Sequence, residues 1–133
     1  SDEESGATLD LISVDLYTGT ARLFKAGAAP GFLVRGGRAR AVGDVSLPMG
    51  ILGGVTGQSR MVHLAAGDYA VLVSDGLLVD GTGWVLQQLE LSAAANDPPD
   101  KLAKTLVEAA RARAEQTGRP DDITAAVLRL ENS

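Results

Sequence analysis

The sequence predicts an α+β fold built on antiparallel pairing, and three observations support this prediction. Strand-like segments fill the first half of the chain, helical segments follow, and one apolar segment, 121–131, closes it. Two pairs of strand-like segments are joined by short Gly-containing turns, which are typical of β-hairpins. The 133 residues, of which 45% are hydrophobic and 22% charged, suit one compact domain.

The first predicted strands form two hairpins. The segment ATLDLISVDLYTG, 7–19, is rich in Leu, Ile and Val, and TARLFKAG, 20–27, follows it directly. In GFLVRGGRARAV, 31–42, Gly36 and Gly37 can supply the positive φ of a tight turn. Each pair of segments therefore predicts two adjacent antiparallel strands.

The middle of the chain predicts a loop and then two strands. We expect SLPMGILGG, 46–54, to be a loop, because Pro48 cannot donate to a strand ladder. The segment SRMVHLAAGD, 59–68, alternates in part, and YAVLV, 69–73, is apolar at every position. A strand with two apolar faces indicates a sheet that is covered on both sides.

Two helices are predicted in the second half. The segment WVLQQLELSAAAN, 84–96, has a weak helical pattern, whereas 96–118 has a clear one. We expect Asp97 to be the N-cap of the second helix and Gly118 to end it. The apolar face of that helix is expected to contain Leu102, Leu106, Ala109 and Ala110.

Charge and composition exclude several classes of function. The net charge is −5 and the 12 Lys and Arg residues are scattered, so we expect no nucleic-acid partner. Without cysteine the chain has no disulfide and no thiolate metal site. No apolar run reaches the roughly 18 residues of a membrane span. We expect no membrane contact from this segment and a cytoplasmic location, with any membrane tether in upstream regions.

Asp75 is the first candidate site residue, because it directly follows the apolar strand in the sequence Ser-Asp-Gly. Such a residue is often only part of a turn. Alternatively, a carboxylate at the mouth of a rigid strand can be an oxygen ligand for a hard cation. Gly76 then leaves room for the metal, its waters or a phosphate.

Asp121 and Asp122 form a second acidic candidate immediately before the last predicted strand. Adjacent side chains point in different directions, so only one of them can face a given site. If the last strand pairs with YAVLV, one carboxylate can meet Asp75 at a common edge. Two carboxylates and water suit Mg²⁺ or Mn²⁺ rather than Zn²⁺. On its own, such a pair is more often a solvated turn or the exit of a helix.

Other polar residues have simpler interpretations. His63 lies inside an alternating segment, and we expect a structural rather than a catalytic histidine. We expect Arg35, Arg38 and Arg60 to be surface residues. An arginine near the site could bind a phosphate bidentately, but the sequence does not select which one.

Five segments together resemble a known family. In order along the chain they are TLDLISVDLYTGTARLFKAGAAPGFLVRGG, LPMGIL, LAAGDYAVLVSDGLL, NDPPDKLAKTLVEAA and DDITAAVLRL. They are similar to the metal-dependent protein serine/threonine phosphatases of the PP2C-like superfamily. The branch that includes stage II sporulation phosphatase E fits best, because AGAAPGF lacks the Gly-His-Pro pattern frequent in the stress-response regulators.

The resemblance implies an antiparallel β-sandwich flanked by helices, with a dinuclear Mn²⁺ or Mg²⁺ centre at one end. It implies that Asp75 and Asp121 bind metal, and that Gly76 and Asp122 support the turns beside them. The implied activity is hydrolysis of phosphoserine or phosphothreonine on a regulatory protein of the anti-sigma-factor antagonist type. Water activated by the two ions attacks phosphorus in line, without a covalent enzyme intermediate.

One departure from the family pattern is large. The G-D-G-[MA]-G segment, whose aspartate bridges the two metals in the family, does not occur in this sequence. We therefore expect residues 7–133 to be the C-terminal part of a catalytic domain, with an incomplete sandwich, and 1–6 to be a flexible lead-in. The chain alone should be weakly active or inactive, and apolar sheet surface left exposed could make it a homodimer.

Two other interpretations stay open. The chain could be a non-catalytic interaction or regulatory module with the same sandwich, although such modules would be expected to lose the metal aspartates. It could also be a plain α+β binding domain in which both acidic motifs are ordinary turns. That interpretation predicts a separation well above about 8 Å between the carboxylates of Asp75 and Asp121, since ligands of one small ion must converge.

Overall fold

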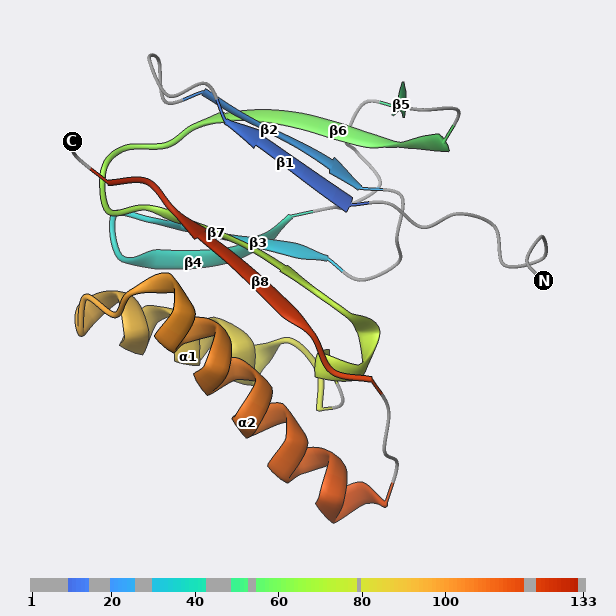
Figure 1. The fold of residues 1–133 in the computed structure, drawn as a ribbon, viewed down its shortest axis with the longest axis vertical. Helices are drawn as coiled ribbons and strands as arrows, with labels where there is room; N and C mark the ends of the chain where they lie inside the picture. Colours follow the sequence, from blue (N-terminus) through green and yellow to red (C-terminus); the bar gives the residue numbers. More distant parts are fainter. Residues whose placement is uncertain are drawn as a thin grey trace.

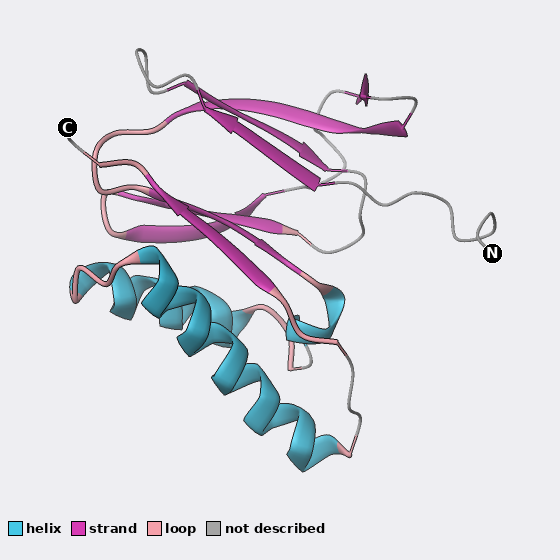
Figure 2. Ribbon diagram, viewed as in Figure 1, coloured by secondary structure: helices cyan, strands magenta, loops and turns pink. Residues whose placement is uncertain are grey.

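The computed structural model describes residues 10–14, 20–25, 30–42, 49–52, 55–78, 80–118 and 122–131. These residues form two four-stranded antiparallel sheets and a layer that contains two α-helices. Both helices lie against one sheet, and the other sheet lies on the opposite side of it (Figure 1). Figure 2 shows the same order of layers, from sheet to sheet to helices. The predicted α+β class with antiparallel sheets is therefore confirmed.

The first sheet has the strand order β1-β2-β6-β5. Its strands are β1 (Asp10–Val14), β2 (Thr20–Lys25), β5 (Met49–Leu52) and β6 (Val55–His63). The predicted pairing of β1 with β2 is confirmed. The prediction of a loop over 46–54 is wrong in part, because β5 pairs with β6 inside it. Strand β5 is at the edge of its sheet. Residues 46–48 and 53–54 of the predicted loop lie outside the described residues.

The second sheet has the strand order β4-β3-β7-β8. Its strands are β3 (Gly31–Arg35), β4 (Arg38–Val42), β7 (Tyr69–Val73) and β8 (Ala125–Arg129). The hairpin turn is confirmed, since Gly36 and Gly37 have φ values of 59° and 82°. Strand β8 is antiparallel to β7, with Val73 opposite Ala125. The end of β7 therefore lies beside the beginning of β8, as the site prediction requires.

The second sheet separates two apolar clusters. Successive side chains of a strand point to opposite faces, so Phe32 and Val71 pack towards the helices, whereas Leu33 and Ala70 pack on the other face. All four side chains have an exposed fraction of 0%. The prediction that YAVLV belongs to a sheet covered on both sides is confirmed.

Helix α1 (Gly83–Ala94) packs on β3 and β4, and helix α2 (Pro99–Thr117) packs on β8. The buried face of α2 contains Leu102, Leu106, Ala110 and Ala114, whereas Ala109 is half-buried. Gly118 ends α2 with a φ of 68°, as predicted. Within the part of the chain that the structure describes, neither helix has both the length and the apolar character to cross a membrane.

The prediction that Asp97 is the N-cap of α2 is wrong. Pro98 occupies that position and provides no side-chain cap. Asp97 is buried one residue earlier, where its carboxylate lies 3.5 Å from Lys101 Nζ and its carbonyl accepts a 2.5 Å hydrogen bond from Tyr69 Oη. The Arg129 guanidinium stacks 4.8 Å from the centre of the Tyr69 ring and donates to the same carbonyl at 3.5 Å. These contacts connect the turn between α1 and α2 to the beginning of β7 and the end of β8.

This junction predicts a pH dependence of stability. Burial raises the pKa of Tyr69 above its ordinary value of 10.0; Arg129 lowers it in part, and Asp97 and Glu131 raise it further. The folded protein therefore favours the neutral phenol more than the unfolded chain does. Tyr69 makes its full contribution to the unfolding free energy below about pH 10, and this contribution is lost as the pH rises through the pKa of the folded protein. We expect the unfolding free energy, measured by urea denaturation, to fall more steeply above about pH 10 in the wild type than in Tyr69→Phe. Equal slopes would contradict the assignment.

Candidate metal centre

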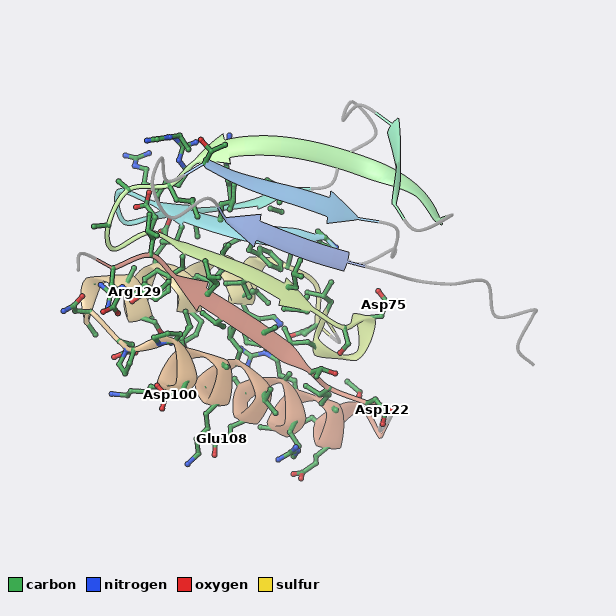
Figure 3. The ribbon with its side chains drawn as sticks, turned by 45° about the horizontal axis from the view of Figure 1, so that its top comes forward. Asp75, Asp100, Glu108, Asp122 and Arg129 are labelled. Atoms are coloured by element: carbon green, nitrogen blue, oxygen red, sulfur yellow. The ribbon has the colours of Figure 1, made fainter. Side chains whose placement is uncertain are left out.

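The Ser-Asp-Gly sequence lies where β7 ends and the chain turns into a short 3₁₀ helix, η1 (Asp75–Leu78). Leu77 N–H donates to Ser74 O at 3.1 Å and closes the turn. The Leu77 side chain is fully buried beneath the helices, so it anchors η1 to the core. Asp75 is exposed, and its carboxylate points outward from the turn (Figure 3). The turn explains how a buried strand can lead directly to a carboxylate at the surface.

Ser74 joins this turn to the segment that precedes β8. Its N–H donates to Thr124 O at 3.1 Å, and its Oγ accepts a hydrogen bond from Thr124 N–H at 2.9 Å. The same Oγ donates to Asp122 O at 3.2 Å. The two bonds of the hydroxyl group connect residues that are 50 and 48 positions apart in the sequence. We call these three hydrogen bonds between Ser74, Asp122 and Thr124 the Ser74 clasp.

The clasp brings the two acidic motifs to the same end of the second sheet. Figure 3 shows Asp75 and Asp122 at this end and Arg129 at the opposite end. Asp122 is exposed like Asp75. Asp121 lies outside the described residues, so its role as a ligand stays a prediction, but Asp122 is its neighbour in the chain. Gly76 is half-buried within η1.

The donors at this edge suit a hard cation, because the described acidic side chains here offer only carboxylate oxygens. His63 does not join them: it is exposed at the end of β6, from which the chain leads to the opposite end of β7. Within the described ranges, no three Asp, Glu, His or Cys side chains are grouped so that they could hold a metal. A complete coordination shell therefore needs donors beyond the described residues.

An open pocket of about 820 Å³ adjoins the clasp. The described residues that line it come from the end of α2 and the approach to β8: Arg111, Ala114, Glu115, Gly118, Asp122, Ile123 and Thr124. The exposed Arg111 guanidinium can bind a phosphate or carboxylate through two parallel hydrogen bonds. Arg35 and Arg38 are exposed, as predicted, but lie on the β3–β4 hairpin at the far end of the sheet.

Sequence reasoning did not identify Ser74, Thr124 or Arg111. The usable signal for Ser74 was a hydroxyl residue directly after a buried strand and directly before the acid. The role of Thr124 depends on the β7–β8 register, and that of Arg111 depends on the packing of α2 against β8. Neither relation can be derived from local sequence.

Comparisons with known proteins agree on one family. The family model described as stage II sporulation protein E (SpoIIE) matches residues 1–131. A curated relative, stage II sporulation protein E of Bacillus subtilis (strain 168), is 28% identical over 136 residues. The match covers 98% of this chain and 16% of the relative, so the chain spans a small part of that protein.

Solved structures place the same chain among phosphatase domains. The phosphatase domain of the cell fate determinant SpoIIE from Bacillus subtilis matches with a TM-score of 0.78 and 28% identity, over 100% of this chain and 59% of that one. The Mycobacterium tuberculosis serine/threonine phosphatase PstP/Ppp matches with a TM-score of 0.67 and 25% identity, over 96% and 61%. The RsbU and RsbW domains of a Mycobacterium tuberculosis protein match with 0.68 and 27%, over 95% and 36%.

Proposed function

Because the chain belongs to the stage II sporulation protein E family and its described residues match the PP2C phosphatase fold, we propose that it forms part of a metal-dependent protein serine/threonine phosphatase domain. The observation that carries this proposal is the Ser74 clasp. It holds the Ser-Asp-Gly turn beside the segment that follows Asp121. An ordinary turn at each motif would not require the two motifs to be fastened together.

In this proposal Asp75 and Asp121 hold Mn²⁺ or Mg²⁺. The donor chemistry fits such an ion, because a carboxylate oxygen is a hard ligand and the exposed Asp75 carboxylate is free to reach it. A SpoIIE phosphatase-domain crystal presoaked with Mn, 27% identical over 96% of this chain, supports manganese as the ion to test. When bound, the ions would supply Lewis-acid activation of water and of the phosphate oxygens. Asp122 and Gly76 support the two turns that present the ligands.

The proposed substrate is a phosphoserine or phosphothreonine side chain on a regulatory protein of the anti-sigma-factor antagonist type. The oxygen of water forms a bond to phosphorus, the bond from phosphorus to the side-chain oxygen breaks, and the products are inorganic phosphate and the free hydroxyl. In this proposal the open pocket beside Asp122 receives part of the substrate protein next to its phosphorylated side chain. Arg111, which lines this pocket, binds an anionic group of that protein.

The experiment that tests this activity is a chimera. Residues 1–131 replace the matched segment of the Bacillus subtilis SpoIIE phosphatase domain, and release of phosphate from a phosphoserine peptide is measured with Mn²⁺. We expect Mn²⁺-dependent turnover, and loss of turnover in the same chimera with Asp75→Asn. Thermal unfolding shows whether the chimera is folded. A folded chimera without turnover would favour the non-catalytic module.

The 133-residue chain by itself should have little activity. The described residues gather no group of three ligands, and the chain spans 59% of the matched phosphatase-domain chain. We expect weak Mn²⁺ binding and almost no hydrolysis of p-nitrophenyl phosphate, because an incomplete acidic cluster neutralises the cations poorly. Turnover by the pure chain equal to that of the chimera would contradict this prediction.

A further inference from the structure

We infer that Ser74 is a positioning residue, which couples Asp75 on one side of the metal centre to the approach to β8 on the other. The inference rests on the proposed function, because it assigns the coupling to a metal centre. It concerns a residue that neither contacts the metal in the proposal nor carries charge.

The Ser74 hydroxyl both donates and accepts a hydrogen bond in the clasp. A serine hydroxyl has one hydrogen to donate and two lone pairs to accept with. Ser74 Oγ donates to Asp122 O at 3.2 Å while it accepts from Thr124 N–H at 2.9 Å. The short side chain thus holds the carbonyl of Asp122 and the N–H of Thr124, which lie on either side of residue 123. Both residues are within three positions of Asp121.

The main-chain carbonyl of Ser74 explains why a hydroxyl is needed here. In an antiparallel ladder, a hydrogen-bonded pair exchanges both N–H to C=O bonds. Ser74 N–H donates to Thr124 O at 3.1 Å, but Ser74 O accepts from Leu77 N–H at 3.1 Å instead of from Thr124. The carbonyl therefore begins η1, and the hydroxyl replaces it as the acceptor for Thr124 N–H.

One residue thus performs two tasks that are normally separate. Its carbonyl starts the turn that directs Asp75 out of the sheet, and its side chain keeps the last ladder pair closed. The position of Asp75 and the position of the 122–124 segment cannot then vary independently. Alanine can start the same turn but cannot close the ladder, whereas threonine can do both and is favourable at the end of a strand.

A purely stabilising hydroxyl would give a different result from a positioning one, and Tyr69→Phe provides the matched control. Tyr69 lies at the other end of the same strand, and its Oη also makes one hydrogen bond to a main-chain carbonyl, at 2.5 Å. Tyr69→Phe and Ser74→Ala each remove one hydroxyl from the β7 segment. Only Ser74→Ala removes it from the acidic end.

The experiment is a titration of the ¹⁵N-labelled chain with Mn²⁺, observed by NMR, on the wild type, Ser74→Ala, Ser74→Thr and Tyr69→Phe. Paramagnetic Mn²⁺ broadens nearby amide signals even when binding is weak. We expect broadening at residues 74–76 and 122–124, and a roughly five- to tenfold higher Mn²⁺ concentration for the same broadening in Ser74→Ala. Exchange of the Thr124 amide with solvent, measured without metal, should accelerate by a similar factor. Ser74→Thr and Tyr69→Phe should match the wild type in both measurements.

The outcomes separate the two proposals. If Ser74→Ala accelerates Thr124 exchange but leaves the Mn²⁺ response unchanged, the positioning role is overturned and the metal centre stands. An equal loss of Mn²⁺ response in Tyr69→Phe would also overturn it, because general destabilisation would then explain the effect. If the wild type shows no broadening around Asp75, the metal centre fails, and the role of Ser74 toward it fails with it.

Discussion

Asp75→Asn is expected to abolish the response of residues 74–76 and 122–124 to Mn²⁺. The substitution keeps the size of the side chain but removes the negative charge, and a neutral amide oxygen is a much poorer ligand for a hard cation. Loss of groups that only support a metal ligand typically lowers affinity 10–100-fold, so loss of the ligand itself should exceed roughly 100-fold. The same NMR titration measures the effect.

Asp100→Asn is the matched control for this prediction. It makes the same change of charge at an exposed carboxylate in the first turn of α2, which is far from the clasp in Figure 3. We expect it to leave the Mn²⁺ response unchanged. A similar loss in both variants would mean that net charge, rather than a site at Asp75, controls binding.

Phe32→Ala is expected to produce the largest loss of stability. Phe32 is fully buried between the second sheet and the helices, where it belongs to the same cluster as Val71 and Leu106. Truncation of a buried phenylalanine loses the transfer free energy of the ring and leaves a cavity, which together cost about 3–5 kcal/mol. Urea denaturation at neutral pH should show this decrease in the unfolding free energy.

Leu91→Ala supplies the comparison. Leu91 is a large apolar residue of α1, but 65% of it is exposed. Its truncation should change the unfolding free energy by less than about 0.5 kcal/mol. If the two variants lost similar stability, the assignment of the core to the space between the sheet and the helices would be wrong.

The sequence could predict the parts of the fold that depend on local chemistry. The Gly36-Gly37 turn needed positive φ at two adjacent positions, and glycine is the residue that adopts it readily. The buried face of α2 followed from residues at helical spacing, and Gly118 marked its end. The site prediction required the last strand to pair with YAVLV, but the sequence did not establish that pairing. The structure shows it, because β8 is antiparallel to β7.

The two failures have different causes. Met49–Leu52 contains a glycine and follows a proline, so its local sequence indicates a loop, but pairing with β6 makes it an edge strand. Asp97 has a side chain suited to an N-cap, but it lies one residue before the cap. There its carbonyl accepts a hydrogen bond from Tyr69, and its carboxylate forms an ion pair with Lys101. The first failure was local, because β5 forms a hairpin with the next strand, with Leu52 opposite Val55. In the second, Tyr69 lies 28 positions from Asp97 in the sequence, so its contact is visible only in the folded protein.

The candidate site was predictable in part. A carboxylate directly after a buried strand, and another before the last strand, indicated the residues to consider, and the end of the sheet where their segments meet followed from antiparallel pairing. The clasp was not predictable, because it depends on a serine carbonyl turning into η1 while the hydroxyl remains in the ladder. That division of roles is visible only in three dimensions.

The most direct test of this account is a crystal structure of the chain soaked with Mn²⁺, in which anomalous scattering locates the metal. We predict one peak that contacts a carboxylate oxygen of Asp75 and one of Asp121, each at about 2.1 Å, as for a small hard cation. Carboxylates more than about 8 Å apart, or a peak that contacts neither residue, would contradict the shared metal centre.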